Sequence, residues 1–163
     1  MNNYLLSIDP SIKNTGFTLW ENKKPIWINS YDFKKYDNCK FFNEIEDKID
    51  DYCFLEDFDL IIERGTFHSK NGIGYETQEH LRGFIAGQFN KLITKDMLIS
   101  PSEWKKWYVK IFWYAKDKKW DKELSLKLAN QVIQEQGWNI TISNHDEADS
   151  LLIGWYYLNK ENK

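Results

Sequence analysis

Hydrophobic positions at the start of the chain alternate with polar ones, as they do in β-strands. Three stretches show this pattern: residues 4–8, 16–20 and 25–31. The polar residues at 21–24 are typical of a tight turn, and Pro10 ends the first stretch directly after Asp9. We therefore expect an antiparallel meander whose first strand ends in a carboxylate.

Farther along, helical spacings alternate with short apolar runs. The run at 59–63 is apolar between its two acids, which is typical of a central parallel strand buried on both faces. Gly137 is suited to the end of a helix. The expected elements after the meander are a helix at 37–53, a strand at 59–63, a polar loop at 64–74, a helix at 76–92, a strand at 96–99, a helix from 102, a helix at 121–136, a short strand at 138–142 and a closing helix at 146–158. Within the helix at 76–92, the predicted inward stripe is Leu81, Phe84, Ile85, Gln88, Phe89 and Leu92.

Acidic residues stand at the ends of these elements. Asp9 and Glu63 each follow a core strand, and Asp146 and Asp149 lie at i and i+3 in the first turn of the closing helix. Sites in open α/β sheets form at the carboxyl ends of neighbouring strands, so we expect the four acids to converge. Hard carboxylate oxygens suit Mg²⁺, and two such ions about 4 Å apart support phosphodiester hydrolysis. The pattern predicts two Mg²⁺ ions per site, with Mn²⁺ as a substitute.

Each acid also has a simpler interpretation. Asp9 alone would be an Asp-Pro turn residue, Glu63 alone would pair with a neighbouring cation, and Asp146 alone would cap a helix. Asp149 lies inside the first turn and cannot serve as the same cap. Glu147 projects from another side of the helix and is expected to be a solvated charge.

Composition and charge limit the class of protein. The 163 residues are expected to form one domain, and 42% hydrophobic content indicates a substantial core. No apolar run approaches the roughly 20 residues that cross a bilayer, so no membrane partner is expected. The N-terminus lacks the basic region of a signal peptide, and Cys39 and Cys53 lack metal-type spacing. These features predict a cytoplasmic protein in a reducing compartment.

The net charge of −3 conceals a basic segment. Residues 101–127 contain eight lysines and four acids, whereas the chain before and after this segment is acidic. Aromatic residues are interleaved with these lysines, and Trp104, Trp107, Trp113 and Trp120 are expected to be core residues rather than base-stacking ones. Such a concentration of lysines favours contact with a phosphate backbone over a merely solvated face.

The motifs together resemble those of RuvC-type Holliday-junction resolvases of the ribonuclease H-like superfamily. The resemblance rests on residues 8–17, 62–67, 81–87, 101–106 and 146–151, which occur in family order and span most of the chain. It implies an α/β fold with a mixed five-stranded sheet flanked by helices. It also implies a metal-dependent endonuclease that resolves four-way DNA junctions, and other branched DNA, by paired nicks. The resemblance implies that Asp9, Glu63, Asp146 and Asp149 are its catalytic, metal-binding residues.

The segment at 111–119 departs from the family, which usually has a Gly-rich basic stretch there. This departure, with the compact length, is similar to the phage-encoded branch, which implies a bacterial host cytoplasm. The resemblance also implies that Phe67 stacks on an unpaired base, with the alternative that it anchors a loop. Nine basic residues are predicted to contact the phosphate backbone of DNA, with a merely solvated surface charge as the alternative for each: Arg64, Lys70, Arg82, Lys105, Lys106, Lys110, Lys116, Lys118 and Lys119.

Two further expectations concern assembly and proton transfer. Gly83 and Gly87, beside Phe84 in the helix at 76–92, would allow close approach either to the protein's own sheet or to a second subunit. The resemblance implies the second subunit, in a two-fold homodimer. His145 is either a loop residue without a role or a proton-transfer group beside the metal ions.

Two other functional classes remain open from the sequence. Actin-like ATPases and sugar kinases also begin with an acid after the first strand, but they need a second lobe for which 163 residues leave no room. A non-catalytic junction-binding protein is disfavoured because all four acids are present.

Overall fold

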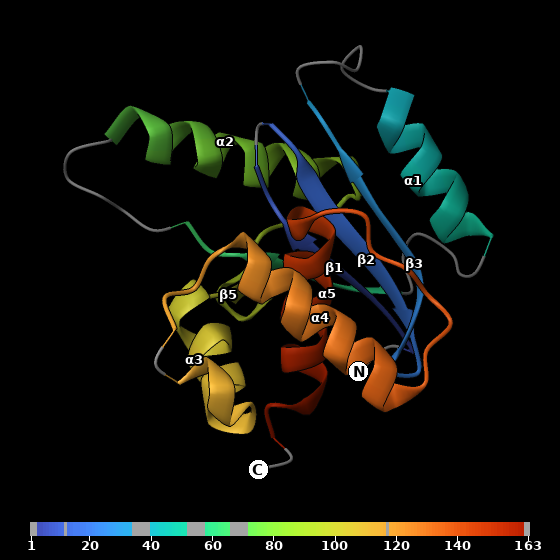
Figure 1. Cartoon of the computed structure of the whole chain (residues 1–163). Coiled ribbons are helices and arrows are strands. Elements are labelled where there is room, and N and C mark those ends of the chain that lie inside the picture. The colour runs from blue at the N-terminus through green and yellow to red at the C-terminus, as the bar shows by residue number, and fades with distance from the viewer. Residues whose placement is uncertain are drawn as a thin grey trace.

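The computed structural model describes residues 3–11, 13–33, 40–51, 58–65, 72–116 and 118–161. A mixed five-stranded sheet lies between helices on both faces (Figure 1). The strands are β1 (Tyr4–Asp9), β2 (Thr15–Glu21), β3 (Lys24–Tyr31), β4 (Phe58–Glu63) and β5 (Leu98–Ile99). The helices are α1 (Lys40–Asp50), α2 (Gly72–Gln88), α3 (Pro101–Ile111), α4 (Lys122–Gln136) and α5 (His145–Asn159), with short 3₁₀ turns η1 (Lys95–Met97) and η2 (Trp113–Ala115).

The strands have the order β3-β2-β1-β4-β5. β1 pairs with β2, and β2 with β3, in antiparallel fashion, which confirms the predicted meander. β4 adds to the other edge of β1 in parallel, and β5 adds in parallel to β4. β1 and β4 are therefore central neighbours, and their carboxyl ends place Asp9 and Glu63 at one edge of the sheet.

The two faces of the sheet bury separate hydrophobic clusters. α1 and α2 cover the face formed by Leu6, Ile8 and their neighbours, whereas α3, α4 and α5 cover the face that includes Leu5 and Ile61. Successive side chains of a strand point to opposite faces. Asp9 and Glu63 lie an even number of residues from Leu5 and Ile61, so both carboxylates face the α3–α5 layer.

Helix α5 approaches the sheet unusually closely. A Cβ atom added to Gly154 of α5 would lie 2.3 Å from Nε1 of Trp20 and 2.5 Å from Oγ of Ser7, so only glycine fits there. Buried hydroxyls join the two layers: Ser7 donates to the carbonyl of Ser150 at 2.8 Å, and the hydroxyls of Thr18 and Ser150 lie 2.7 Å apart. These contacts hold α5 against β1 and β2 in a defined register.

Three predicted elements differ from the structure. The segment at 138–142 is not a strand; Trp138 instead packs edge-on against Trp20 and Trp155, with ring centroids 5.6 and 5.1 Å away. The alternating apolar residues of this segment pack against the core, but its backbone forms no ladder with any strand that the structure describes. The strand expected at 96–99 contains only Leu98 and Ile99, because η1 occupies the preceding residues.

The helix expected at 76–92 is shifted towards the N-terminus. α2 begins at Gly72, inside the expected loop, and ends at Gln88, after which Asn90 has a φ of 51°. Two residues of the predicted inward stripe are exposed, Phe84 by 41% and Leu92 by 86%.

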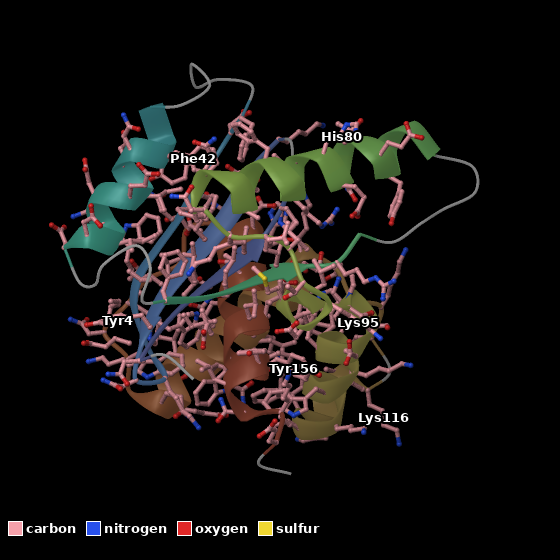
Figure 2. The ribbon with its side chains drawn as sticks, turned by 180° about the vertical axis from the view of Figure 1, so that it is seen from behind. Tyr4, Phe42, His80, Lys95, Lys116 and Tyr156 are labelled. Atoms are coloured by element: carbon pink, nitrogen blue, oxygen red, sulfur yellow. The ribbon has the colours of Figure 1, made fainter. Side chains whose placement is uncertain are left out.

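Aromatic rings join α1 to α2 and to the residue just after it. Figure 2 shows Phe42 of α1 beside α2, and its ring lies 5.5 Å from the ring of Phe84 and 5.9 Å from that of Phe89. The edge-on arrangement of these rings is a favourable aromatic geometry. Residue Phe84 therefore contacts α1 with one edge of its ring and leaves the rest exposed.

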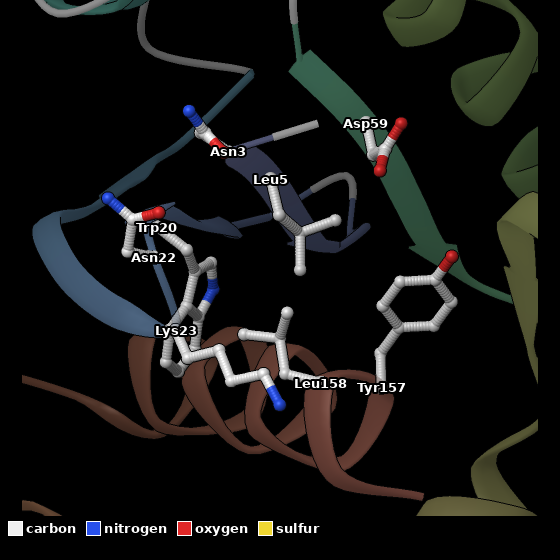
Figure 3. A pocket seen from close by; sticks show the side chains of 8 residues that line it. All are labelled: Asn3, Leu5, Trp20, Asn22, Lys23, Asp59, Tyr157 and Leu158. Carbon is white, nitrogen blue, oxygen red and sulfur yellow. The ribbon is translucent and has the colours of Figure 1, made fainter. Parts of the chain in front are cut away.

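The end of the sheet opposite Asp9 and Glu63 has a small pocket. Figure 3 shows the side chains that line it, among them Leu5, Trp20 and Leu158 together with Lys23 and Asp59. Its volume of about 140 Å³ is below the roughly 300 Å³ of small-molecule sites. Among the described residues, no helix combines the length and apolar character needed to span a bilayer.

Candidate active site

The four predicted acids meet where β1 and β4 end beneath the first turn of α5. Burial raises the pKa of Asp9 well above its usual value, and the negative charges of Glu63, Asp149 and Asp146 raise it further. Such mutual effects require the carboxylates to be near one another in a poorly solvated place. The structure thus brings together all four residues that the sequence pattern singled out.

The pKa shifts of Glu63 and Asp149 have the same main cause. Burial raises the pKa of Glu63, while the charge of Lys105 and a hydrogen bond from Trp104 oppose the shift. Burial raises the pKa of Asp149 to about 7, and a hydrogen bond with Ser125 and the charge of Lys105 oppose that shift. The site therefore concentrates negative charge that its protein surroundings only partly compensate.

Gly16 permits the close approach of α5 to this edge of the sheet. It pairs with Asp9 across β1 and β2, and a Cβ atom added to it would lie 2.0 Å from the carbonyl oxygen of Asp146. The turn before it is closed by Thr15, whose hydroxyl donates to the carbonyl of Ser11 at 2.6 Å. A glycine at this position lets the first turn of α5 rest directly on the strand that flanks Asp9.

The first turn of α5 is fixed by Asn144, whose side-chain oxygen accepts hydrogen bonds from the backbone N–H groups of Asp146 and Glu147, both at 3.0 Å. Asp146 is therefore not the helix cap, and its carboxylate is free for other contacts. Nδ2 of Asn14 donates to Oδ2 of Asp146 at 2.8 Å. Nε2 of His145 lies 3.3 Å from Oδ1 of Asp146, which places the histidine beside the acids.

Glu147 corrects a prediction. It was expected to be a solvated charge, but it is only 5% exposed. Its carboxylate accepts hydrogen bonds from Ser30 Oγ at 3.0 Å, the backbone N–H of Ser143 at 2.6 Å and Asn144 Nδ2 at 3.0 Å. These partners come from β3 and from the loop before α5. Glu147 therefore fastens the start of α5 to the meander and faces away from the four acids' shared site.

Asp149 has an incompletely satisfied carboxylate. Its Oδ1 atom is buried and has no hydrogen-bond partner among the residues that the structure describes. Buried oxygens of this kind are rare in proteins and commonly mark an ion or a water. Within the same residues, no three His, Cys, Asp or Glu side chains already stand in a metal-holding arrangement.

Lys105 belongs to this site rather than to an outer surface. Its charge opposes the raised pKa values of Asp9, Glu63 and Asp149. Its Nζ atom lies 4.9 Å from the ring centroid of Trp104, within the range of a cation–π contact. The ammonium group thus lies over an aromatic ring and near enough to the carboxylates to affect their pKa values.

Arg82 corrects another prediction. A phosphate contact was expected, but the side chain is only 2% exposed. Its Nε donates to the carbonyl oxygen of Glu63 at 2.6 Å, and its guanidinium pairs with Glu79 at 3.1 Å. Arg82 therefore links α2 to the end of β4, and in this structure its guanidinium is not presented to a phosphate.

The other predicted DNA contacts differ in placement. Phe67 and Lys70 lie outside the described residues. The remaining cations of the set are exposed, as Figure 2 illustrates for Lys116 at the edge of the molecule: Arg64, Lys106, Lys110, Lys116, Lys118 and Lys119. Among the interleaved tryptophans, Trp104 is fully buried as expected, but Trp113 is 84% exposed. The prediction of a core role is therefore wrong for Trp113.

The predicted dimer face lies on the exposed side of α2. A Cβ atom added to Gly83 or to Gly87 would meet nothing within 4 Å among the described residues, so neither glycine is needed for contact with the protein's own sheet. Phe84 lies between them and is 41% exposed.

Sequence reasoning missed several residues that contact the acids. Asn14 and Trp104 each donate a hydrogen bond to one of the four carboxylates, and Ser125 counteracts the raised pKa of Asp149. Asn14 lies in the polar segment that directly follows Asp9, so its nearness in sequence could have indicated a place beside the site. Trp104 and Ser125 are separated from their partners by many residues, and only the folded structure shows these pairs.

Comparisons with known proteins agree with this architecture. No family model and no curated protein matches the sequence. Among solved structures, Thermus thermophilus RuvC in complex with a Holliday junction substrate has a TM-score of 0.59 at 12% identity, covering 97% of this chain and 95% of that chain. Another T. thermophilus RuvC structure has a TM-score of 0.54 at 13% identity, with 98% and 96% covered. The Fowlpox virus resolvase in complex with Holliday junction DNA has a TM-score of 0.53 at 20% identity, with 98% and 99% covered.

Proposed function

We propose that this chain, which has the ribonuclease H-like fold of these resolvases, is a metal-dependent endonuclease that nicks branched DNA and resolves four-way junctions by paired cuts. The observation that carries the proposal is the convergence of Asp9, Glu63, Asp146 and Asp149, each of the other three raising the pKa of Asp9. Carboxylates gathered without a full countercharge are suited to cations.

The donor set fits Mg²⁺, with Mn²⁺ as its substitute, because all four side chains offer hard oxygen atoms. The buried Oδ1 of Asp149, which lacks a hydrogen-bond partner among the described residues, is a further oxygen that a cation could bind. Asp9, Glu63, Asp146 and Asp149 would hold two ions. When bound, such ions supply the Lewis acidity that phosphodiester hydrolysis needs.

Neighbouring side chains would orient these ligands. Asn14 fixes one oxygen of Asp146 by donating to it, and Trp104 fixes one oxygen of Glu63 at 2.9 Å. Lys105 contributes a positive charge that offsets the carboxylates and suits an approaching phosphate, and the contacts described in the next subsection define the roles of Trp104 and its neighbours. His145, whose Nε2 lies 3.3 Å from Oδ1 of Asp146, would accept or release a proton at a ring nitrogen.

Basic side chains would hold the DNA backbone. The proposed contacts are Arg64 and Lys70, together with six lysines of the basic segment at 101–127: Lys105, Lys106, Lys110, Lys116, Lys118 and Lys119. Phe67 would stack on an unpaired base near the branch point. Trp113, exposed among these lysines, is a second aromatic side chain available for such stacking.

The active form would be a homodimer that pairs through the exposed face of α2. Gly83 and Gly87 leave room for close approach, and Phe84 offers an exposed apolar surface. A two-fold axis would present two active sites to symmetric strands of a four-way junction, which is what paired nicks require.

The test uses labelled four-way, three-way, flap and linear duplex DNA, each incubated with the protein and Mg²⁺ or with a chelator. Mg²⁺-dependent symmetric nicks in the four-way junction are expected, with linear duplex left intact. Binding without cleavage under every metal condition would instead identify a non-catalytic junction-binding protein. A nucleotide-binding assay is run in parallel. Nucleotide binding without junction binding would identify an actin-like ATPase.

A further inference from the structure

Two tryptophans from the segment at 101–125 reach two of the four acids. Nε1 of Trp104 donates to Oε1 of Glu63 at 2.9 Å, and this hydrogen bond lowers the pKa of Glu63 against the effect of burial. Trp104 is 0% exposed, so water does not compete for the indole N–H group. The direction of this N–H group therefore sets the orientation of the Glu63 carboxylate.

The second contact passes through a serine. Nε1 of Trp120 donates to Oγ of Ser125 at 2.8 Å, and the Ser125 hydroxyl is close enough to Asp149 to oppose the rise in the pKa of that carboxyl. Because the hydroxyl accepts from the indole, its own hydrogen is left to point at the carboxylate. Ser125 is 1% exposed, so this chain of donors is also shielded from water.

The two tryptophans form one unit. Their ring centroids lie 4.9 Å apart and their planes meet at 88°, which is a favourable edge-to-face contact. Nζ of Lys105 lies 4.9 Å from the ring of Trp104 and 5.6 Å from that of Trp120. A displacement of either ring would therefore affect Glu63, Asp149 and the Lys105 charge together.

We propose that Trp104 and the Trp120–Ser125 pair are positioning residues that orient Glu63 and Asp149 for metal binding. The inference rests on the proposed function and adds to it the residues that set the ligands' geometry. Hydrogen-bond partners of metal ligands typically change metal affinity by about 10- to 100-fold when removed. The tryptophans touch neither the metal nor the scissile phosphate and act through the carboxylates.

The test compares Trp104→Phe and Ser125→Ala with the unchanged protein. Trp104→Phe keeps a ring and removes the N–H donor, and Ser125→Ala removes one oxygen atom from a buried helix position. Mn²⁺ affinity without DNA is measured by calorimetry, and junction affinity is measured with a chelator present. Each variant is expected to bind Mn²⁺ about 10-fold more weakly, to need more Mg²⁺ for half-maximal cleavage and to keep its junction affinity within about twofold.

Trp155→Phe is the matched control, since Trp155 packs on Trp20 and Trp138 in the same core layer. It is expected to leave Mn²⁺ affinity unchanged. Thermal unfolding checks that each variant is folded, and if Trp104→Phe does not fold, Ser125→Ala alone decides. Unchanged Mn²⁺ affinity in the folded variants overturns the positioning inference while leaving the nuclease proposal intact. Absence of both Mn²⁺ binding and cleavage in the unchanged protein overturns the proposed function itself.

Discussion

The α-carbon of Gly16 lies so close to the backbone of Asp146 that a Cβ atom would stand 2.0 Å from its carbonyl oxygen. The missing side chain allows the first turn of α5, with two of the four acids, to rest against the strand beside Asp9. One glycine in the meander thus determines how near the two parts of the site come.

Gly16→Ala is expected to displace the start of α5. Overpacking of a tight contact costs about 1–3 kcal/mol of unfolding free energy, and the displacement would separate Asp146 from Asp9. Chemical denaturation measures the stability, and a junction cleavage assay measures the activity. Gln134→Ala is the control, because that side chain is exposed on α4, away from the acids and from the proposed subunit contact, and alanine is well tolerated in helices. Equal stability of the two variants would contradict the close contact.

Asp9→Asn is expected to abolish cleavage while leaving junction affinity largely intact. The substitution removes the carboxylate whose pKa is raised, after burial, by each of the other three acids, and an amide is a poor substitute as a metal ligand. Cleavage is measured with Mg²⁺, and binding is measured with a chelator. Asp47→Asn, in an exposed position of α1, should change neither quantity. Retained nicking by Asp9→Asn would refute the assignment of the metal site.

The four acids could be predicted because each stands at an end that the hydrophobic pattern reveals. Asp9 and Glu63 terminate apolar runs, and the i, i+3 spacing of Asp146 and Asp149 places both on one side of a helix. The opening meander and the strand that ends at Glu63 followed from the same pattern, whereas the five-stranded arrangement of the sheet was implied by the family resemblance.

Glu147 and Arg82 could not be predicted in this way. Both are charged residues whose burial depends on partners far away in sequence, Ser30 for Glu147 and the carbonyl of Glu63 for Arg82. A helical pattern shows which residues share a face but not whether a distant loop covers a polar one. The same reason explains the wrong prediction for Trp113, because its exposure depends on the direction in which η2 projects from the core.

Glu147→Gln is expected to lower stability with little effect on the chemistry. Its Oε1 accepts from Ser30 and Asn144, and its Oε2 accepts from the N–H of Ser143, so an amide nitrogen would face a donor at one of these places. An unsatisfied buried hydrogen-bonding group costs about 1–3 kcal/mol. Denaturant unfolding measures this loss, and Glu123→Gln, at an exposed position of α4, is the control. Cleavage per folded molecule should be close to that of the unchanged protein, and its complete loss would make Glu147 a fifth member of the site.

Stability of the metal-free protein is expected to fall as pH rises. Burial raises the pKa of Asp149 to about 7, and burial also raises the pKa of Asp9 well above its usual value. Between the unfolded value near 4 and the folded value, the folded chain keeps a proton that the unfolded chain releases, so a rise in pH favours unfolding. The thermal midpoint, measured with a chelator, should therefore decrease between about pH 5 and about pH 8.

Two variations of this experiment identify the cause. Asp149→Asn removes one titrating carboxyl and should reduce the slope of the midpoint against pH. Mg²⁺ should raise the midpoint most at the upper end of the range, where the carboxylates are ionised and able to bind it. An identical slope for Asp149→Asn and the unchanged protein would show that the loss of stability originates elsewhere.

Phe84→Lys is expected to convert the proposed dimer into a monomer. The ring is 41% exposed on α2 between two glycines with open space above them, so a second copy of α2 could approach closely there. A lysine would place two like charges near the two-fold axis, where they would be desolvated at a cost that exposed charges avoid. Mass in solution is measured by light scattering after size-exclusion chromatography, and Trp113→Lys, at the 84% exposed tryptophan, is the control for loss of an exposed ring. A monomer that still binds junctions should cut one strand at a time instead of making paired nicks. A dimeric mass for Phe84→Lys would place the subunit contact on another surface.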